Sequence, residues 1–253
     1  MNVIDGQWFM SGVSKNDPRC VHSAEELLSV IEKVGFLPLF ENEVPGFSVE
    51  NITQAKNWWC GREKVDPWEW RAILARTGKV AYGKFFSKKA GFVSKKWFPE
   101  FANFRRDGYD FDSRYEEGKA DHREKLIMDL FWPMEGELWE VDPKKAREMD
   151  LFSFEVKEKA GFGKNGEKGF EGTCSKLQMG TYLLVKDFVQ RKNKEGEPYG
   201  WAIARYTLPE YLWGYNFVTG KYKENPKESG RKIVEHIGKY YDCDEKTIRR
   251  VIK

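Results

Sequence analysis

The stretch FSFEVKEKAGFGKNGEKGFEGTCSKLQM, residues 152–179, carries the pattern that decides the fold class. Apolar residues at helical spacing predict a helix over 152–160, which ends at Gly161. The glycine-rich segment that follows is a loop by composition. It leads into a longer predicted helix over 170–188, where apolar residues again recur at helical spacing. Two helices joined by a short polar loop are typical of helix-turn-helix proteins.

The residues on either side of this stretch complete the pattern. Side chains alternate between apolar and polar over 188–192 and 201–206, around the polar turn 193–198, and this predicts a β-hairpin. Upstream, a third helical pattern covers 122–131. The order helix, helix, helix, hairpin is that of a winged helix-turn-helix unit.

The first half of the chain shows a similar plan. A capping-box spacing that begins at Ser23 predicts a helix over 23–34, and Asp66-Pro67 opens a second helix over 66–77. Two short β-prone runs over 80–97 predict a lysine-tipped hairpin. We therefore predict an α+β fold of tandem winged helix-turn-helix domains, mostly helical with short β-hairpin wings.

The distribution of charge and the positions of turn and loop residues suggest how the chain divides into domains. We expect an N-terminal winged-helix-like domain over 1–106 and a C-terminal winged helix over 151–216. Residues 107–150 form an acidic connector with the first helix of the second domain, and 217–253 form a helical extension.

The composition excludes several classes of protein. The 253 residues are 40% hydrophobic, 15% aromatic and 33% charged, which is too aromatic for a disordered tail and too charged for a membrane protein. No apolar run approaches the roughly 18–20 residues that span a bilayer, and no signal region precedes the first helix. We expect a cytoplasmic protein without membrane association. The four cysteines form no CxxC pair, so we expect them to be reduced.

Positive charge is concentrated in two segments that an acidic one separates. Residues 79–106 hold eight basic residues and one acidic residue, and 157–196 hold nine basic and five acidic, whereas 107–150 hold fourteen acidic and seven basic. Lysine and arginine on a hairpin beside a helix can neutralise phosphates. Alternatively, they keep the hairpin tips soluble. The candidate nucleic-acid-binding residues, on the two hairpins, the glycine loop and the helix after it, are Lys84, Lys88, Lys89, Lys164, Lys168, Lys176, Gln178, Arg191, Lys192 and Lys194.

Tryptophans gather at 58–59 and 68–70. Their simplest role is to fill a small core. The alternative is that Trp68 or Trp70 lines a base pocket, with a nearby carboxylate that orients water. The candidate carboxylates are Glu63, Asp66 and Glu69.

Two other motifs do not support a ligand site. Residues 161–166 fit G-x-G-x-x-G, but a helix precedes them where a dinucleotide site needs a strand. The acidic run 107–112 lacks the full ligand set of a calcium loop. We therefore expect no metal and no cofactor.

Several stretches resemble the AlkZ/YcaQ group of winged-helix DNA glycosylases, and in particular the AlkZ-related proteins. They are FSFEVKEKAG at 152–161, FEGTCSKLQM at 170–179, ARYTLPE at 204–210, VGFLPLF at 34–40, DPWEWR at 66–71 and GKFF at 83–86. The similarity spans about residues 24–215. It implies a scaffold that cradles double-stranded DNA and, in active members, excises alkylated or crosslinked bases.

The chain departs from this group at one important place. Active members carry Gln-x-Gln or Gln-x-Asp shortly after the first helix, to position the hydrolytic water, whereas this chain reads GFLPL at 35–39. The catalytic residues therefore stay unassigned. Three hypotheses remain: a DNA glycosylase that hydrolyses an N-glycosidic bond, a non-enzymatic DNA-binding or regulatory protein, and a protein-interaction module.

Overall fold

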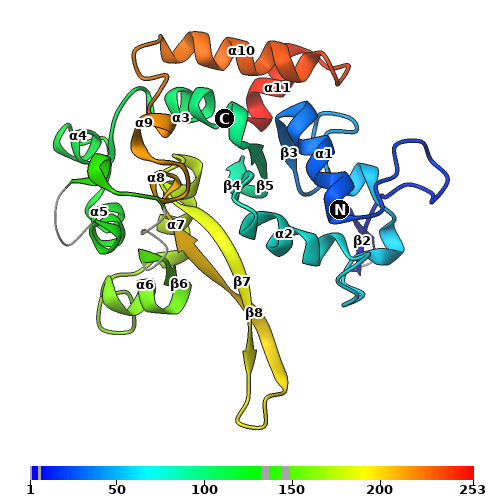
Figure 1. Cartoon of the computed structure of the whole chain (residues 1–253), viewed down its shortest axis with the longest axis horizontal. Helices are drawn as coiled ribbons and strands as arrows, with labels where there is room; N and C mark the ends of the chain where they lie inside the picture. Colours follow the sequence, from blue (N-terminus) through cyan, green and yellow to red (C-terminus); the bar gives the residue numbers. More distant parts are fainter. Residues whose placement is uncertain (1, 5–6, 133–136, 144–148) are drawn as a thin grey trace.

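The computed structural model describes residues 2–4, 7–132, 137–143 and 149–253 (Figure 1). The first half contains β1 (Asn2–Ile4), β2 (Gln7–Phe9), α1 (Ala24–Val34), β3 (Phe36–Pro38), α2 (Pro67–Arg76), β4 (Val80–Phe86), β5 (Lys89–Ser94) and α3 (Phe98–Arg106). The middle contains α4 (Phe111–Glu116), α5 (His122–Met128), β6 (Leu151–Phe152), α6 (Ser153–Lys159) and α7 (Phe170–Met179). The remainder is β7 (Leu184–Lys192), β8 (Pro198–Thr207), α8 (Pro209–Trp213), α9 (Tyr215–Val218), α10 (Pro226–Gly238) and α11 (Glu245–Val251).

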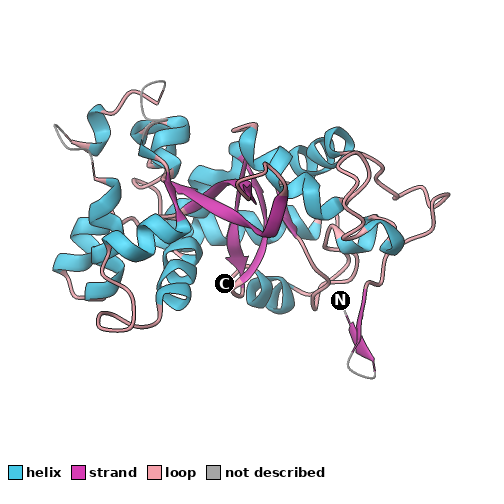
Figure 2. Ribbon diagram, turned by 90° about the horizontal axis from the view of Figure 1, so that it is seen from below, coloured by secondary structure: helices cyan, strands magenta, loops and turns pink. Residues whose placement is uncertain are grey.

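Two small antiparallel sheets organise the chain, which confirms the α+β class. The first sheet has the strand order β3-β5-β4 and the second has the order β6-β8-β7. In Figure 2 the strands of these two sheets lie at the centre, with helices on both sides, whereas the separate β1–β2 pair lies at the edge next to the N-terminus. Each sheet joins one short strand to a hairpin, and each short strand precedes the helix that leads to its hairpin.

Side-chain caps determine where the two predicted helices of the first half begin. The Ser23 hydroxyl accepts a hydrogen bond from the Glu26 N–H at 3.2 Å and caps α1, while Asp66 caps α2, which begins at Pro67. Leu27 and Ile31 of α1 are fully buried in the core. Both helices confirm the expectations from sequence.

The helix predicted over 170–188 is wrong in its second half. α7 ends at Met179, and Leu184 begins β7. Thr181 between them has a φ of +62°, and the Arg106 guanidinium donates to its carbonyl at 2.8 Å and to its hydroxyl at 3.1 Å. This distant arginine holds the chain in a turn that a continuous helix would not permit.

The two predicted hairpins differ in exposure. The tip of β4–β5 is anchored to the body of the molecule, since the Ser87 hydroxyl donates to the Arg250 carbonyl at 2.8 Å and the Lys88 N–H lies 3.2 Å from the Met179 sulfur. The first hairpin therefore does not project as a free wing. The tip residues Ser87, Lys88 and Lys89 themselves are exposed. The β7–β8 hairpin is longer, and its outer half extends away from the body of the molecule (Figure 1).

The C-terminal extension is helical, as predicted. α10 packs along α3, and the Asn103 amide donates to the Ser229 hydroxyl at 3.0 Å and to the Glu224 carbonyl at 3.1 Å. The four cysteines are free thiols in the structure.

Candidate functional site

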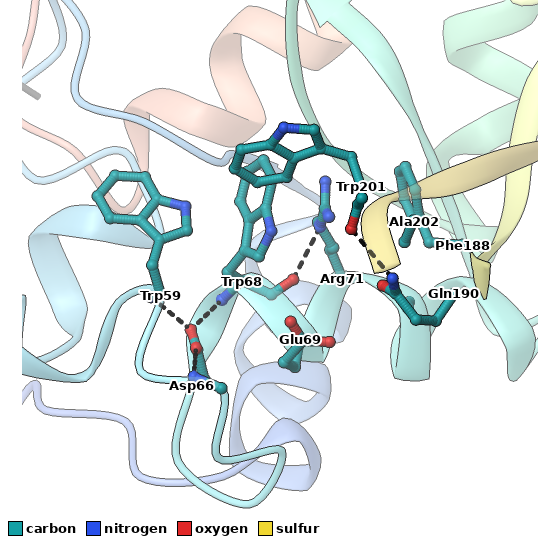
Figure 3. Close-up of a pocket in the computed structure, with 12 residues that line it drawn as sticks. Trp59, Asp66, Trp68, Glu69, Arg71, Phe188, Gln190, Trp201 and Ala202 are labelled. Atoms are coloured by element: carbon teal, nitrogen blue, oxygen red, sulfur yellow. Dashed lines mark hydrogen bonds between the residues drawn. The ribbon is translucent and has the colours of Figure 1, made fainter. Parts of the chain in front are cut away.

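A cavity of about 360 Å³ opens between α2 and the middle of the β7–β8 hairpin (Figure 3). Its walls include Trp59, Trp68 and Trp201, so we call it the tryptophan cavity. The Trp59 and Trp68 ring centroids lie 6.1 Å apart, with a tilt of 58° between the planes. Trp201 is 79% exposed and lies over the opening. The volume is within the range of small-ligand pockets.

The Asp66 carboxylate fixes the loop that carries Trp59. It accepts hydrogen bonds from the backbone N–H groups of Trp59 at 3.1 Å, Gly61 at 2.9 Å and Trp68 at 2.9 Å. Trp59 has a φ of +58°, a left-handed conformation that is costly for a bulky residue. Asp66 is fully buried. Its carboxylate therefore supports the wall of the cavity structurally.

Arg71 lines the cavity and joins the two halves of the chain there. Its guanidinium carbon lies 3.3 Å from the centroid of Trp68 and 4.0 Å from that of Phe188, so the cation is stacked between a ring from α2 and a ring from β7. The Arg71 Nε also donates to the Trp68 carbonyl at 2.8 Å. Burial lowers the pKa of Arg71, but a guanidinium stays charged at neutral pH.

Of the three candidate carboxylates, Glu69 is the one available for chemistry in the cavity. Glu69 is half-buried and lines the wall, and within the described ranges its carboxylate has no hydrogen-bond partner. Asp66 is engaged by three N–H groups. Glu63 is exposed and lies outside the cavity lining.

Trp70 does not line the cavity, and its expected role in a base pocket is wrong. Its side chain is 1% exposed and packs in the core, with its indole N–H donating to the Glu63 carbonyl at 3.1 Å. Trp59, Arg71, Phe188 and Trp201 were not among the site residues expected from sequence. A tryptophan within the predicted hairpin, as at Trp201, was an available signal.

The outer end of the same hairpin carries three exposed cations. Arg191, Lys192 and Lys194, which we call the tip cations, are all exposed. Because β7 and β8 also supply one wall of the tryptophan cavity, the tip cations and that wall lie on the same hairpin.

Gln178 and Lys84 form a contact inside the protein. The Gln178 side chain is 2% exposed, and its amide oxygen accepts from the Lys84 N–H at 2.9 Å. The Lys84 ammonium donates to the Ser175 hydroxyl at 3.1 Å. The expectation that Gln178 binds nucleic acid is therefore wrong, because its side chain ties α7 to β4.

The other expected cations lie apart from the cavity. Lys176 is exposed, but its ammonium pairs with Asp121 at 2.7 Å and lies 3.6 Å from Glu124. The remaining ones are exposed and do not line the cavity; they are Lys88, Lys89, Lys164 and Lys168.

Two other kinds of feature are absent from the part of the chain that the structure describes. No group of three or more histidine, cysteine, aspartate or glutamate side chains could hold a metal ion there. Within the same residues, no helix is long and apolar enough to cross a membrane.

Comparison with known proteins gives a family match. The family model described as AlkZ related matches residues 21–253, a range that includes both three-stranded sheets and the whole lining of the tryptophan cavity. No curated protein and no solved structure matches the chain. The family match covers nearly all of the sequence, and the chain therefore belongs to the AlkZ-related family.

Proposed function

We propose that this protein binds double-stranded DNA and receives one base, turned out of the duplex stack, in the tryptophan cavity. Membership of the AlkZ-related family indicates a DNA glycosylase-like or DNA-binding function. The observation that carries the proposal is that the tip cations and the cavity wall belong to the same hairpin. Cations that hold the phosphate backbone would bring the duplex to the mouth of the cavity.

The proposed architecture is a pair of winged helix-turn-helix domains, over 1–106 and 151–216, with the second using α5 from the connector 107–150. Its support is a similar order of elements in the two halves, with one helix more before the hairpin in the second half. The first half runs α1, β3, α2, β4, β5 and the second runs α5, β6, α6, α7, β7, β8. In both sheets the short strand pairs with the last strand of the hairpin. Residues 217–253 add the α10–α11 extension against α3.

The chemistry of the cavity suits a flat aromatic ligand. Stacking of a base on an aromatic side chain contributes about 1–3 kcal/mol, and Trp59, Trp68 and Trp201 offer such surfaces. The Arg71 guanidinium stacks on the Trp68 ring and holds it in place. A turned-out base would therefore meet a wall that is already ordered, which lowers the cost of binding.

Glu69 is the proposed residue for base excision. Its carboxylate would orient a water and accept a proton from it, while the water oxygen bonds to the sugar C1′ and the base departs with the electron pair of the broken C1′–N bond. Such hydrolysis needs no cofactor.

The second candidate is DNA binding without base excision, and β3 favours it. The segment 35–39, where active glycosylases carry their glutamine motif, has Phe36, Leu37 and Leu39 fully buried. It therefore presents no polar side chain to a water.

Both candidates can be tested with a duplex that contains a single alkylated base and with the same duplex unmodified. Binding is followed by fluorescence anisotropy at several salt concentrations, and base loss by strand breaks after alkali treatment. We expect Glu69→Gln to bind and to lose strand breakage, whereas the matched variant Glu63→Gln retains both. Binding by the wild type without strand breaks would support the second candidate. Absence of duplex binding at low salt would refute the DNA function.

A further inference from the structure

A second cavity, of about 480 Å³, lies where the end of α2, the end of β5, the base of the β7–β8 hairpin and α8 meet. We call it the junction cavity, and it shares no lining residue with the tryptophan cavity. The Trp213 indole N–H donates to the Gly78 carbonyl at 2.7 Å and ties two of its walls together. Its charged lining residues are Arg76, Lys95, Asp150, Lys186, Asp187 and Arg205.

Positive charge is in excess around the junction cavity. Its two carboxylates are both paired: Asp187 with Arg76 at 3.0 Å and Asp150 with Lys186 at 2.5 Å. In the described part of the chain, Lys95 and Arg205 have no carboxylate partner. The lining therefore carries two positive charges that no acidic residue of the cavity balances.

Two buried polar atoms of the lining also lack a hydrogen-bond partner among the described residues. They are the Asp150 Oδ1, on a side chain that is only 1% exposed, and the Arg205 Nε. An unsatisfied buried donor or acceptor is costly in a folded protein. The Arg205 N–H needs an acceptor, and the Asp150 oxygen needs a donor. A ligand that supplies an acceptor to Arg205 and a donor to Asp150 would remove the energetic cost of both unsatisfied atoms.

We propose that the junction cavity binds a phosphate monoester. The phosphate oxygens would accept hydrogen bonds from Arg205 and Lys95, and a hydroxyl of the ligand would donate to Asp150. A phosphate monoester carries about −1.5 to −2 charges at neutral pH, which matches the excess charge of the lining. This chemistry occurs at the 5′-phosphorylated end of a DNA strand and in a free mononucleotide.

The test uses isothermal titration calorimetry on the full chain, with inorganic phosphate and deoxyadenosine 5′-monophosphate as probes. We expect saturable binding of the nucleotide by the wild type. The double variant Arg205→Gln/Lys95→Gln should bind at least about tenfold more weakly, because it removes charge-assisted hydrogen bonds. Lys95 is exposed, so the single variant Lys95→Gln should fold normally and also weaken binding.

The matched control is Lys227→Gln/Lys239→Gln, which removes the same charge from the start and the end of α10. It should leave nucleotide binding unchanged. No saturable binding of either probe by the wild type, or equal weakening in the control, would overturn the proposal.

Competition with DNA distinguishes the two sources of phosphate. Displacement of the nucleotide by a 5′-phosphorylated duplex, and not by the unphosphorylated duplex, identifies a DNA end as the ligand. Simultaneous binding of the nucleotide and either duplex identifies a free nucleotide. Nucleotide binding by a protein that binds no duplex would support the junction site while refuting the DNA function.

Discussion

Replacing Asp66 with alanine should destabilise the protein and disorder the wall of the tryptophan cavity. The carboxylate is fully buried and accepts three backbone hydrogen bonds, from Trp59, Gly61 and Trp68. The Trp68 bond caps α2. The other two hold a loop in which Trp59 adopts a left-handed conformation.

The size of the expected loss of unfolding free energy follows from these three hydrogen bonds. Loss of a helix N-cap costs about 1 kcal/mol, and a hydrogen bond to a charged group contributes about 1.5–3 kcal/mol. Trp59 and Gly61 are exposed, so water can replace part of their bonding, and we use the low end of that range. The expected decrease for Asp66→Ala is about 3–4 kcal/mol of unfolding free energy.

Urea denaturation followed by tryptophan fluorescence measures this decrease. Asp66→Asn should fall between the wild type and Asp66→Ala, because its single oxygen can serve Trp59 and Trp68 but its amide group faces the Gly61 N–H. The control Glu69→Gln, three residues along the same helix, should change stability by less than about 0.5 kcal/mol. A decrease below about 1 kcal/mol for Asp66→Ala would show that water replaces the carboxylate and would refute this reasoning.

Three further predictions concern stability and binding. Glu210→Ala leaves the Arg106 guanidinium, which lies 2.6 Å from Glu210 and is 1% exposed, without its carboxylate. Urea denaturation should show a destabilisation of about 3–5 kcal/mol, and a destabilisation as small as that of Glu228→Ala, at a half-buried surface position, would contradict this prediction. Burial lowers the pKa of His236 below its ordinary value of 6.5, so the unfolded chain binds more protons and the unfolding free energy should fall as pH decreases through 6.5. His236→Gln should flatten that pH dependence, and an unchanged slope would exclude His236 as its source. Replacing the tip cations with glutamine should reduce the slope of log affinity for DNA against log salt by about 0.9 for each phosphate that the hairpin no longer neutralises, whereas an unchanged slope would remove the hairpin from the interface.

Several elements could be predicted from sequence because local interactions determine them. Ser23 caps α1 through an N–H three residues away, and Asp66-Pro67 begins α2 within a single turn. The alternation on either side of the turn 193–198 likewise depends on neighbouring residues, and the hairpin forms there. The AlkZ-related family was also readable from short stretches of sequence, and the family match confirms it. The tandem winged-helix architecture stays a prediction.

Burial and the sites depend on interactions between distant residues. α7 stops at Met179, directly before its C-cap Gly180, and Arg106, more than seventy residues earlier, holds the turn at Thr181 that follows. Gln178 was expected to bind nucleic acid and Trp70 to line a base pocket, yet packing places both side chains inside the protein.

The sequence by itself determined the α+β class, the main helices, the cationic hairpin and the family. Only the tertiary structure decided which tryptophans face a cavity, which carboxylate is available, and where unpaired cations meet. The physical reason is the distance along the chain over which each kind of interaction acts. Caps, turns and periodicity act within a few residues, whereas the tryptophan cavity forms when Trp59 and Trp68 meet Phe188 and Trp201, more than a hundred residues away in the chain.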